Sequence, residues 1–205
     1  MQSKYNSEYE IGIDEAGRGP LIGRVYAGAV ILGPDFKQDD TIILNDSKKM
    51  TPKKRQLALA WIKKNVTAWG YGFAEASEID QINILEATNN AMKRAVENLK
   101  LTFPKYTDMN NLIVDGVGWD NRFPGYAVNS FVKGDSKYLS IACASIIAKE
   151  YHDSYIKEIC SHNMELDTKY DLLSNMGYGT KKHLAGIILH GPSTYHRMSF
   201  KPIKK

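Results

Sequence analysis

The hydrophobic pattern of the N-terminal third predicts three β-strands. Residues 9–14 form an apolar run, and residues 24–32 carry apolar side chains on both faces. A strand that is apolar on both faces is typical of the interior of a sheet. Residues 67–73 then place a threonine or an aromatic residue at every second position. We therefore expect a sheet that contains all three segments, with residues 24–32 in its interior.

Helices are expected between and after these strands. Thr51 is a favourable N-cap and Pro52 suits the first helical position, so a helix is predicted to about residue 64, burying Leu57 and Trp61. A second helical region begins at Ser77. Its apolar face consists of Met92, Ala95, Val96 and Leu99.

The second half of the chain continues this alternation. Residues 112–114 and 126–132 are strand candidates, and a long helix is predicted from about residue 140 to 159. One side of this helix is expected to carry Ile141, Ala144, Ala148, Tyr151 and Tyr155. Shorter helices are expected beyond residue 160, around a loop at residues 177–179. The alternation predicts an α/β domain with a mixed sheet.

Length and composition set the broad class. At 205 residues the chain predicts a single domain, with an α/β core over about 1–160 and a helical part over about 161–205. The two cysteines form no disulfide framework, and Cys143 is expected to be a small buried side chain. Since neither a leader nor a long apolar run is visible, we expect a soluble, cytoplasmic protein with no membrane partner. Nothing requires more than a monomer.

The formal net charge is +4, and basic residues gather in separate clusters. These lie at residues 48–49, 53–55, 181–183 and 201–205. Separate basic patches are what a protein that binds a polyanion needs. Solvated helix faces explain any one cluster equally well.

Acidic residues lie at the ends of predicted strands. Asp14 and Glu15 end the first strand, Asp115 ends a later one, and Asp135 lies at a strand-to-helix junction. Carboxylates that meet at one edge of a sheet repel one another unless cations lie between them. Oxygen ligands favour Mg²⁺ or Mn²⁺, and two such ions suit phosphoryl chemistry. These four acids are therefore predicted to be both metal ligands and catalytic residues.

The adjacency of Asp14 and Glu15 raises a geometric difficulty. Consecutive residues of a regular strand point to opposite faces of the sheet. We therefore expect the chain to leave strand geometry at this pair, with Gly17 and Gly19 supplying the freedom to do so.

Several neighbouring residues are candidates for substrate binding. Arg18, between Gly17 and Gly19, suits a phosphate or a sugar, although a solvent-facing turn is the alternative. Ser47 and Lys48 offer a hydroxyl and an ammonium to a phosphate, or form an ordinary helix-entry loop. Tyr178, beside the basic Lys181, is placed to stack on a base or sugar, or to pack under its own loop.

The histidines give no metal signature. His183, His190 and His196 lack the spacing of zinc ligands, and His152 is expected on a helix surface rather than as a catalytic base. Two alternatives to metal-dependent phosphoryl chemistry remain at this point. A nucleic-acid-binding module without catalysis leaves the acids unexplained, and a glycoside hydrolase needs two carboxylates on opposite sides of a sugar.

The motif Asp14-Glu15-Ala16-Gly17-Arg18-Gly19-Pro20-Leu21 resembles the signature of the ribonuclease HII family, the type 2 ribonucleases H. The likeness continues, in the family's order, over nearly the whole chain. It includes residues 45–49, 78–85, 115–116, 133–149, 177–180 and 196–200.

This resemblance implies a ribonuclease H-like fold with a helical C-terminal extension. It implies an endoribonuclease that uses two divalent ions, Mg²⁺ or Mn²⁺, on RNA/DNA hybrids and on ribonucleotides embedded in duplex DNA. The cut lies on the 5′ side of the ribonucleotide and leaves 3′-hydroxyl and 5′-phosphate ends. The resemblance assigns the 2′-hydroxyl contact to Gly17, Arg18 and Gly19, and sugar stacking to Tyr178.

The chain departs from the family pattern at a few positions. Met198 stands where a basic residue is common, and residues 150–152 are less basic than usual, so weaker backbone binding is expected. Asn89-Asn90 replaces a pair that is normally apolar, which is expected to loosen helix packing. Residues 201–205 lack the aromatic pair of a sliding-clamp peptide.

Overall fold

Five strands form one mixed sheet. The computed structural model describes residues 1, 2, 5, 9–34, 36, 37, 44, 47 and 50–204. The strands are β1 (Ile11–Ala16), β2 (Val25–Ile31), β3 (Ala68–Ala74), β4 (Asn111–Asp115) and β5 (Ala127–Phe131), in the order β3-β2-β1-β4-β5. β1 and β2 are antiparallel, as are β2 and β3, whereas β4 runs parallel to both β1 and β5. The predicted mixed sheet is confirmed, and β2 is fully buried in its interior.

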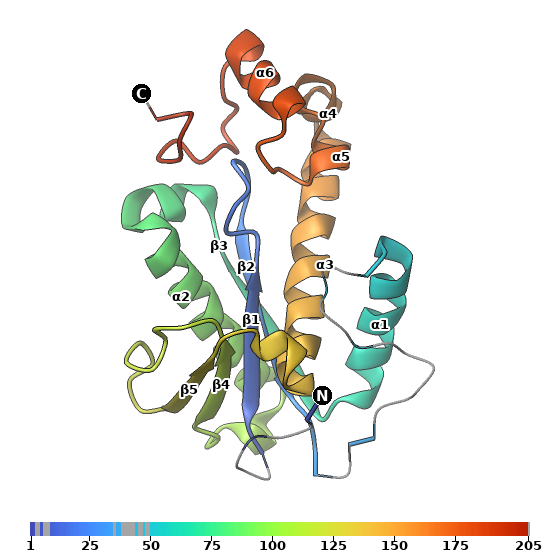
Figure 1. Ribbon diagram of the computed structural model, residues 1–205, viewed down its shortest axis with the longest axis vertical. Helices are drawn as coiled ribbons and strands as arrows, with labels where there is room; N and C mark the ends of the chain where they lie inside the picture. The colour runs from blue at the N-terminus through green and yellow to red at the C-terminus, as the bar shows by residue number, and fades with distance from the viewer. Residues whose placement is uncertain are drawn as a thin grey trace.

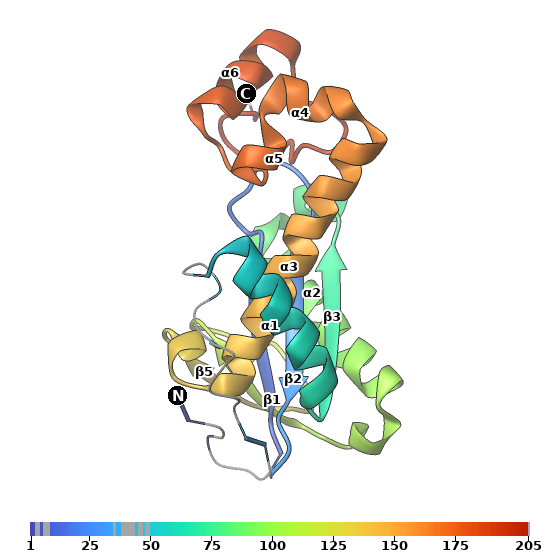
Figure 2. The same cartoon turned by 90° about the vertical axis from the view of Figure 1, so that its right-hand side faces the viewer.

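Long helices cover the two faces of this sheet (Figure 1). α2 (Ala76–Thr102) packs on β2 and β3, and α3 (Leu139–His162) packs on β1 and β2. α1 (Pro52–Asn65) lies on the outer side of α3 (Figure 2). Gly28 of β2 allows α3 to approach closely, because a Cβ atom there would lie 2.3 Å from the carbonyl oxygen of Ala144.

The predicted face of α2 is confirmed, and that of α1 is wrong; α3 is buried on all sides from Leu139 to Ala148, so it has no single buried face there. Met92, Ala95, Val96 and Leu99 are all buried. In α1 the buried residues are Arg55, Ala58 and Ile62, while Leu57 is 58% exposed. The helix contacts α3 along a stripe one residue further along the chain, and Trp61 packs at its margin against Phe36.

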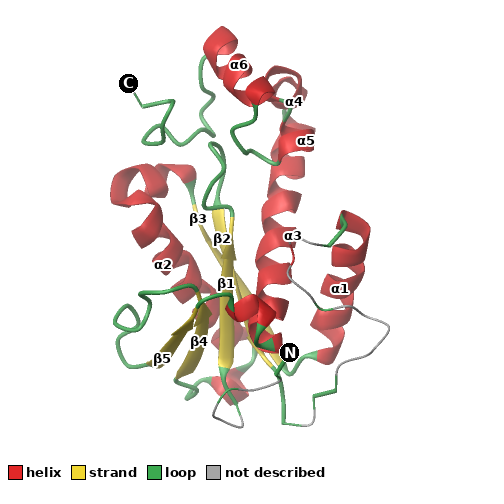
Figure 3. Cartoon of the chain, viewed as in Figure 1, coloured by secondary structure: helices red, strands yellow, loops and turns green. Residues whose placement is uncertain are grey.

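The C-terminal part caps the far end of α3 (Figure 3). It contains α4 (Met164–Tyr170), α5 (Leu172–Asn175) and α6 (Lys181–His190). The chain then returns to the turn between β1 and β2, where Ile22 forms a bridge with His196. Within the part of the chain that the structure describes, no helix is long and apolar enough to cross a membrane.

Two 3₁₀ turns complete the described elements. η2 (Pro104–Tyr106) follows α2, and η3 (Gly134–Ser136) lies between β5 and α3. α2 itself bends at Asn83, which has a φ of 71° and whose side-chain oxygen accepts hydrogen bonds from the backbone N–H groups of Leu85 and Glu86. The side chain therefore caps the second part of α2 after the bend.

Candidate active site

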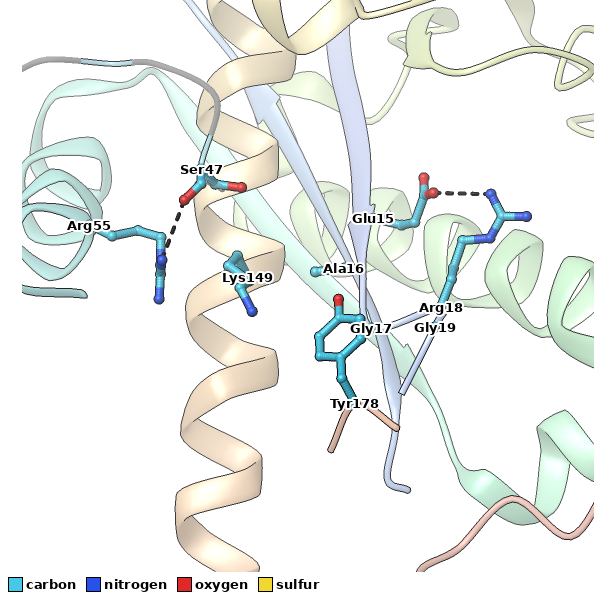
Figure 4. Close-up of a pocket in the computed structure, with 9 residues that line it drawn as sticks. All are labelled: Glu15, Ala16, Gly17, Arg18, Gly19, Ser47, Arg55, Lys149 and Tyr178. Atoms are coloured by element: carbon cyan, nitrogen blue, oxygen red, sulfur yellow. Dashed lines mark hydrogen bonds and ion pairs between the residues drawn. The ribbon is translucent and has the colours of Figure 1, made fainter. Parts of the chain in front are cut away.

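A cleft of about 470 Å³ opens where β1 ends beside α3. Sequence motifs that are far apart meet here (Figure 4). The cleft is lined by Glu15, Ala16, Gly17, Arg18, Gly19, Ser47, Arg55, Lys149 and Tyr178. Of the predicted substrate-binding residues, Lys181 does not line the cleft but lies exposed at the first position of α6. Lys48 lies outside the described residues.

Asp14 and Glu15 remain in regular strand geometry, so the predicted departure at this pair is wrong. β1 pairs with β2 continuously to Ala16, with Asp14 opposite Gly28 and Glu15 opposite Ala27. Asp14 therefore shares the α3 face with Gly28, and Glu15 points to the opposite face. Both residues lie at the end of β1, and of the two Glu15 lines the cleft.

Asp14 is the electrostatic centre of the acidic cluster. It is buried, and desolvation raises its pKa well above the ordinary value, with Glu15 and Asp115 adding to the rise. Two hydrogen bonds act in the opposite direction, one from the Ser145 hydroxyl and one from the backbone N–H of Glu15. The Ser145 oxygen also lies 2.9 Å from the hydroxyl of Ser47, so α3 connects Asp14 to the loop before α1.

Asp115 and Asp135 lie next to β1 along the sheet edge. Asp115 ends β4, the parallel neighbour of β1, and its Oδ1 accepts a 2.6 Å hydrogen bond from the backbone N–H of Gly134. Asp135 is the next residue, buried in η3. Within the described residues no three acidic, histidine or cysteine side chains stand in an arrangement that holds a metal ion. The structure thus gathers the segments that carry the acids without closing their side chains into a ligand shell.

The chemistry of these residues nevertheless fits a divalent cation. Asp14, Glu15 and Asp115 offer carboxylate oxygens, the donors that Mg²⁺ and Mn²⁺ prefer. The raised pKa of Asp14 reports repulsion from its two neighbours in addition to burial. A cation among them offsets both costs of ionising Asp14.

Arg197 holds the turn after β1 from behind. Its side chain is fully buried, and burial lowers its pKa to about 10, which leaves it charged at neutral pH. Its N–H groups donate at 2.6–3.0 Å to the backbone carbonyls of Gly17, Arg18, Pro20, Gly23 and Arg24. All five guanidinium donors are therefore used.

This arrangement fixes the direction of two peptide groups. In a trans peptide the carbonyl of one residue and the N–H of the next point in opposite directions. Because the carbonyls of Gly17 and Arg18 face Arg197, the N–H groups of Arg18 and Gly19 face away from it, on the side of the cleft. Gly17 also needs to be glycine: its φ is +86°, and a Cβ atom would lie 2.4 Å from His152.

Tyr178 lies against this turn and lines the same cleft. A Cβ atom on Gly19 would be 3.2 Å from Cε1 of the tyrosine ring, so the ring lies against bare backbone. The ring is 41% exposed, and Lys149 Nζ is 5.8 Å from its centroid. The Arg18 side chain turns back to pair with Glu15 at 3.2 Å (Figure 4). Tyr178 is therefore placed as an open platform rather than packed under its own loop.

The opposite wall rests on a buried charge network. Arg55 of α1 pairs with Glu150 and Asp153 of α3 and donates to the carbonyl of Ser47. Asp153 also pairs with Lys149, which keeps that lysine at the cleft. Glu150 is thus a buried structural residue, whose negative charge pairs with Arg55.

Sequence reasoning misjudged or missed several of these residues. His152 is fully buried beside Gly17, not on the helix surface, because α3 is covered by the turn after β1 at that point. Arg55 was assigned to a basic surface cluster, and Arg197 received no role of its own. Arg55 lies on the same stripe of α1 as Ala58 and Ile62, so its burial could not be expected from the predicted face of Leu57 and Trp61. Arg197 had no signal in the sequence, since its partners are more than 170 positions away.

Comparisons with known proteins agree with this architecture. The family model described as Ribonuclease HII matches residues 11–203. The ribonuclease HII of Bacteroides thetaiotaomicron is 47% identical over 191 residues, which cover 93% of this chain and 88% of that protein.

Solved structures share the fold at lower identity. The ribonuclease H2 of Pyrococcus horikoshii has a TM-score of 0.72 at 21% identity and covers 95% of both chains. The ribonuclease HIII called Bst-RNase HIII, solved in complex with Mn²⁺, has a TM-score of 0.68 at 19% identity, covering 97% of this chain and 68% of that one. The family match and the shared fold make the assignment secure: the chain belongs to the ribonuclease HII family, and it is a ribonuclease H, a hydrolase of the RNA strand of RNA/DNA hybrids.

Proposed function

We propose that this ribonuclease H also cuts duplex DNA at embedded ribonucleotides, on the 5′ side of the ribonucleotide, leaving 3′-hydroxyl and 5′-phosphate ends. The observation that carries the proposal is the turn at residues 17–19. Arg197 directs the N–H groups of Arg18 and Gly19 toward the cleft, where Glu15 supplies an acidic wall. Two N–H donors on bare backbone match the hydroxyl oxygen by which RNA differs from DNA.

Tyr178 supplies the second half of the selection. Its exposed ring lies against Gly19, so a nucleotide next to the one that contacts the turn reaches the ring face. We assign this ring to the sugar of the deoxynucleotide that follows the ribonucleotide. Together the turn and the ring select a junction between RNA and DNA.

Asp14, Glu15, Asp115 and Asp135 are the residues that we assign to metal binding and catalysis. Bound divalent ions activate water and stabilise negative charge on phosphate oxygens, which is the chemistry that phosphodiester hydrolysis requires. The protein contributes the position of the carboxylates: β1 and β4 place three of them at neighbouring strand ends, and the Ser145 hydroxyl orients Asp14. The Mn²⁺ complex of the related ribonuclease HIII supports the choice of ion class.

The remaining basic residues are assigned to the nucleic-acid backbone. Lys149 lines the cleft beside Tyr178, and Lys181 is exposed at the start of α6 near the same loop. Lys48 follows Ser47 in the sequence and is assigned to the same strand of phosphates. Such contacts bind by charge and carry no sequence preference, so binding is expected to weaken with salt.

Cleavage of a labelled duplex that contains one ribonucleotide tests the proposal. With Mg²⁺ the product is expected to end in a 3′-hydroxyl directly 5′ of the ribonucleotide, and EDTA is expected to abolish cutting. Asp14→Asn is expected to bind the duplex and leave it intact. Cutting of an all-RNA strand in a hybrid without cutting at the single ribonucleotide contradicts the roles given to residues 17–19 and Tyr178.

A further inference from the structure

Two buried histidines lie behind Tyr178 and have no part in the function proposed above. The Nε2 atoms of His183 and His196 are 3.0 Å apart. On the outer sides of the pair, His183 Nδ1 lies 3.0 Å from the carbonyl oxygen of Tyr178, and His196 Nδ1 lies 2.9 Å from the backbone nitrogen of Ser193. Both side chains are buried, with Tyr170 packed against each ring.

The partners determine where each proton lies. The N–H of Ser193 can only donate, so Nδ1 of His196 must accept and the proton of that ring is on Nε2. His196 Nε2 then donates to His183 Nε2, which leaves the proton of His183 on Nδ1. His183 Nδ1 in turn donates to the carbonyl of Tyr178, which can only accept. The geometry therefore allows one continuous, directed chain of hydrogen bonds.

Both rings are neutral around pH 7, as this chain requires. Burial lowers the pKa of His183, and burial together with the neighbouring His183 lowers the pKa of His196 to about 4. A second proton on His183 would place two donors face to face at the 3.0 Å contact, and a second proton on His196 would place its Nδ1–H against the backbone N–H of Ser193.

This chain of hydrogen bonds runs from the loop of Tyr178 to the segment that carries Arg197. At one end the carbonyl of Tyr178 also accepts from the backbone N–H of Thr180, which holds the base of the tyrosine loop. At the other end His196 immediately precedes Arg197, whose guanidinium holds the carbonyls of Gly17 and Arg18. A backbone hydrogen bond from the N–H of Leu21 to the carbonyl of Gly177 already joins the tyrosine loop to the turn. The histidine pair adds a second connection, and its contact with the tyrosine loop is the bond from His183 Nδ1 to the Tyr178 carbonyl.

We propose that His183 and His196 are positioning residues that set Tyr178 against the turn at residues 17–19 and thereby sharpen selection of the RNA–DNA junction. This inference rests on the function proposed above, because it needs Tyr178 to contact the substrate. A pair that served packing alone would require only the shape of the rings. The directed protons and the adjacency of His196 to Arg197 favour a role in alignment.

Two substitutions at position 183 separate alignment from packing. In His183→Asn the amide nitrogen takes the place of Nδ1 and keeps the donor to the Tyr178 carbonyl, while the bond to His196 is lost. In His183→Gln the longer amide reaches the place of Nε2, while the bond to Tyr178 is lost. Both changes replace one aromatic ring by one amide. His190→Asn, at an exposed position of the same helix, is the matched control.

The readout is the ratio of kcat/KM on a duplex with one ribonucleotide to kcat/KM on a continuous RNA/DNA hybrid. We expect His183→Gln to lower this ratio about threefold to tenfold, the value of one neutral hydrogen bond, mainly through KM on the junction duplex. His183→Asn is expected to lower it less, and His190→Asn to leave it unchanged. Equal ratios for the Asn and Gln variants overturn the proposal.

A measurement on the wild-type protein covers the case in which the variants fail to fold. Nitrogen chemical shifts of the imidazole rings report the tautomer. We expect the Nδ1–H form for His183 and the Nε2–H form for His196, and the Nε2–H form for His183 overturns the directed chain. If the wild-type enzyme cuts hybrids but not junctions, the proposed function fails, whereas the tautomers still report on the histidine pair.

Discussion

Replacing Arg197 by lysine tests the support behind the turn at residues 17–19. The substitution keeps the positive charge and much of the side-chain length. It changes the number and direction of the donors, because lysine carries three N–H groups on one atom and arginine carries five in a planar fork. Since all five arginine donors meet backbone carbonyls, at least two carbonyls lose their partner.

The cost follows from those carbonyls. Leaving a buried acceptor without a partner costs about 1–3 kcal/mol, so two of them cost roughly 2–6 kcal/mol. For a chain of this size each kcal/mol lowers the melting temperature by about 2–4 °C, which gives an expected fall of roughly 4–24 °C. A typical domain has a free energy of unfolding of about 5–15 kcal/mol, so the variant is expected to fold.

Thermal unfolding and cleavage are measured on the same preparations. Arg197→Lys is also expected to lose preference for the single-ribonucleotide duplex over the hybrid, because the N–H groups of Arg18 and Gly19 are no longer held toward the cleft. Arg122→Lys is the control, since Arg122 pairs with Glu86 at a partly exposed site where an ion pair is worth about 0–1 kcal/mol. If Arg197→Lys melts within 2 °C of Arg122→Lys, the reasoning about the five carbonyls is refuted.

Four further substitutions test the acids and the turn. Asp14→Asn is expected to raise the melting temperature in EDTA, because the amide removes a buried charge beside Glu15 and Asp115. Mg²⁺ is expected to raise the melting temperature of the wild type but not of this variant, and an equal rise in both counts against Asp14 as a ligand. Gly17→Ala is expected to lower the melting temperature, because of the positive φ at Gly17 and the close approach of His152. Gly19→Ala is expected to leave the melting temperature nearly unchanged and to reduce the preference for the junction duplex by displacing Tyr178. An equal fall in melting temperature for both variants argues against this contrast. Ser145→Ala is expected to raise the Mg²⁺ concentration for half-maximal cleavage by about tenfold, since the hydroxyl orients Asp14, and an unchanged titration removes that role.

The sheet could be predicted from sequence because strand patterns are local. The alternation in β3 and the apolar run of β2 each lie within a few residues, and both strands form where they were expected. The face of α1 could not be predicted in the same way. Whether Leu57 or Ala58 faces inward depends on how the helix sits on α3, which is a tertiary contact with no signal in the helix itself.

The candidate site divides along the same line. The acids and the glycine-flanked arginine lie in contiguous motifs, so their residue types alone indicate metal and phosphate chemistry. The geometry of the Asp14–Glu15 pair was predicted wrongly, because the expectation assumed that both side chains must share one face. At the end of a strand this is unnecessary, since β1 stays paired to Ala16 while Glu15 still reaches the cleft.

The C-terminal part holds the conformation of the turn at residues 17–19, to which we assign recognition of the ribonucleotide. Without Arg197 the five carbonyls of this glycine-rich turn would bind only water, and the flexibility of glycine would allow the turn many conformations. Arg197 removes that freedom with a single side chain, at the cost of burying a charge that is offset mainly by backbone carbonyls. That cost is worthwhile only if the direction of the peptide groups matters. The same segment carries His196, so one return of the chain controls both the turn and the loop of Tyr178. The surface to which we assign substrate selection is therefore supported by residues that do not line the cleft, and substitutions of those residues are expected to change selectivity before they change the chemistry at the acids.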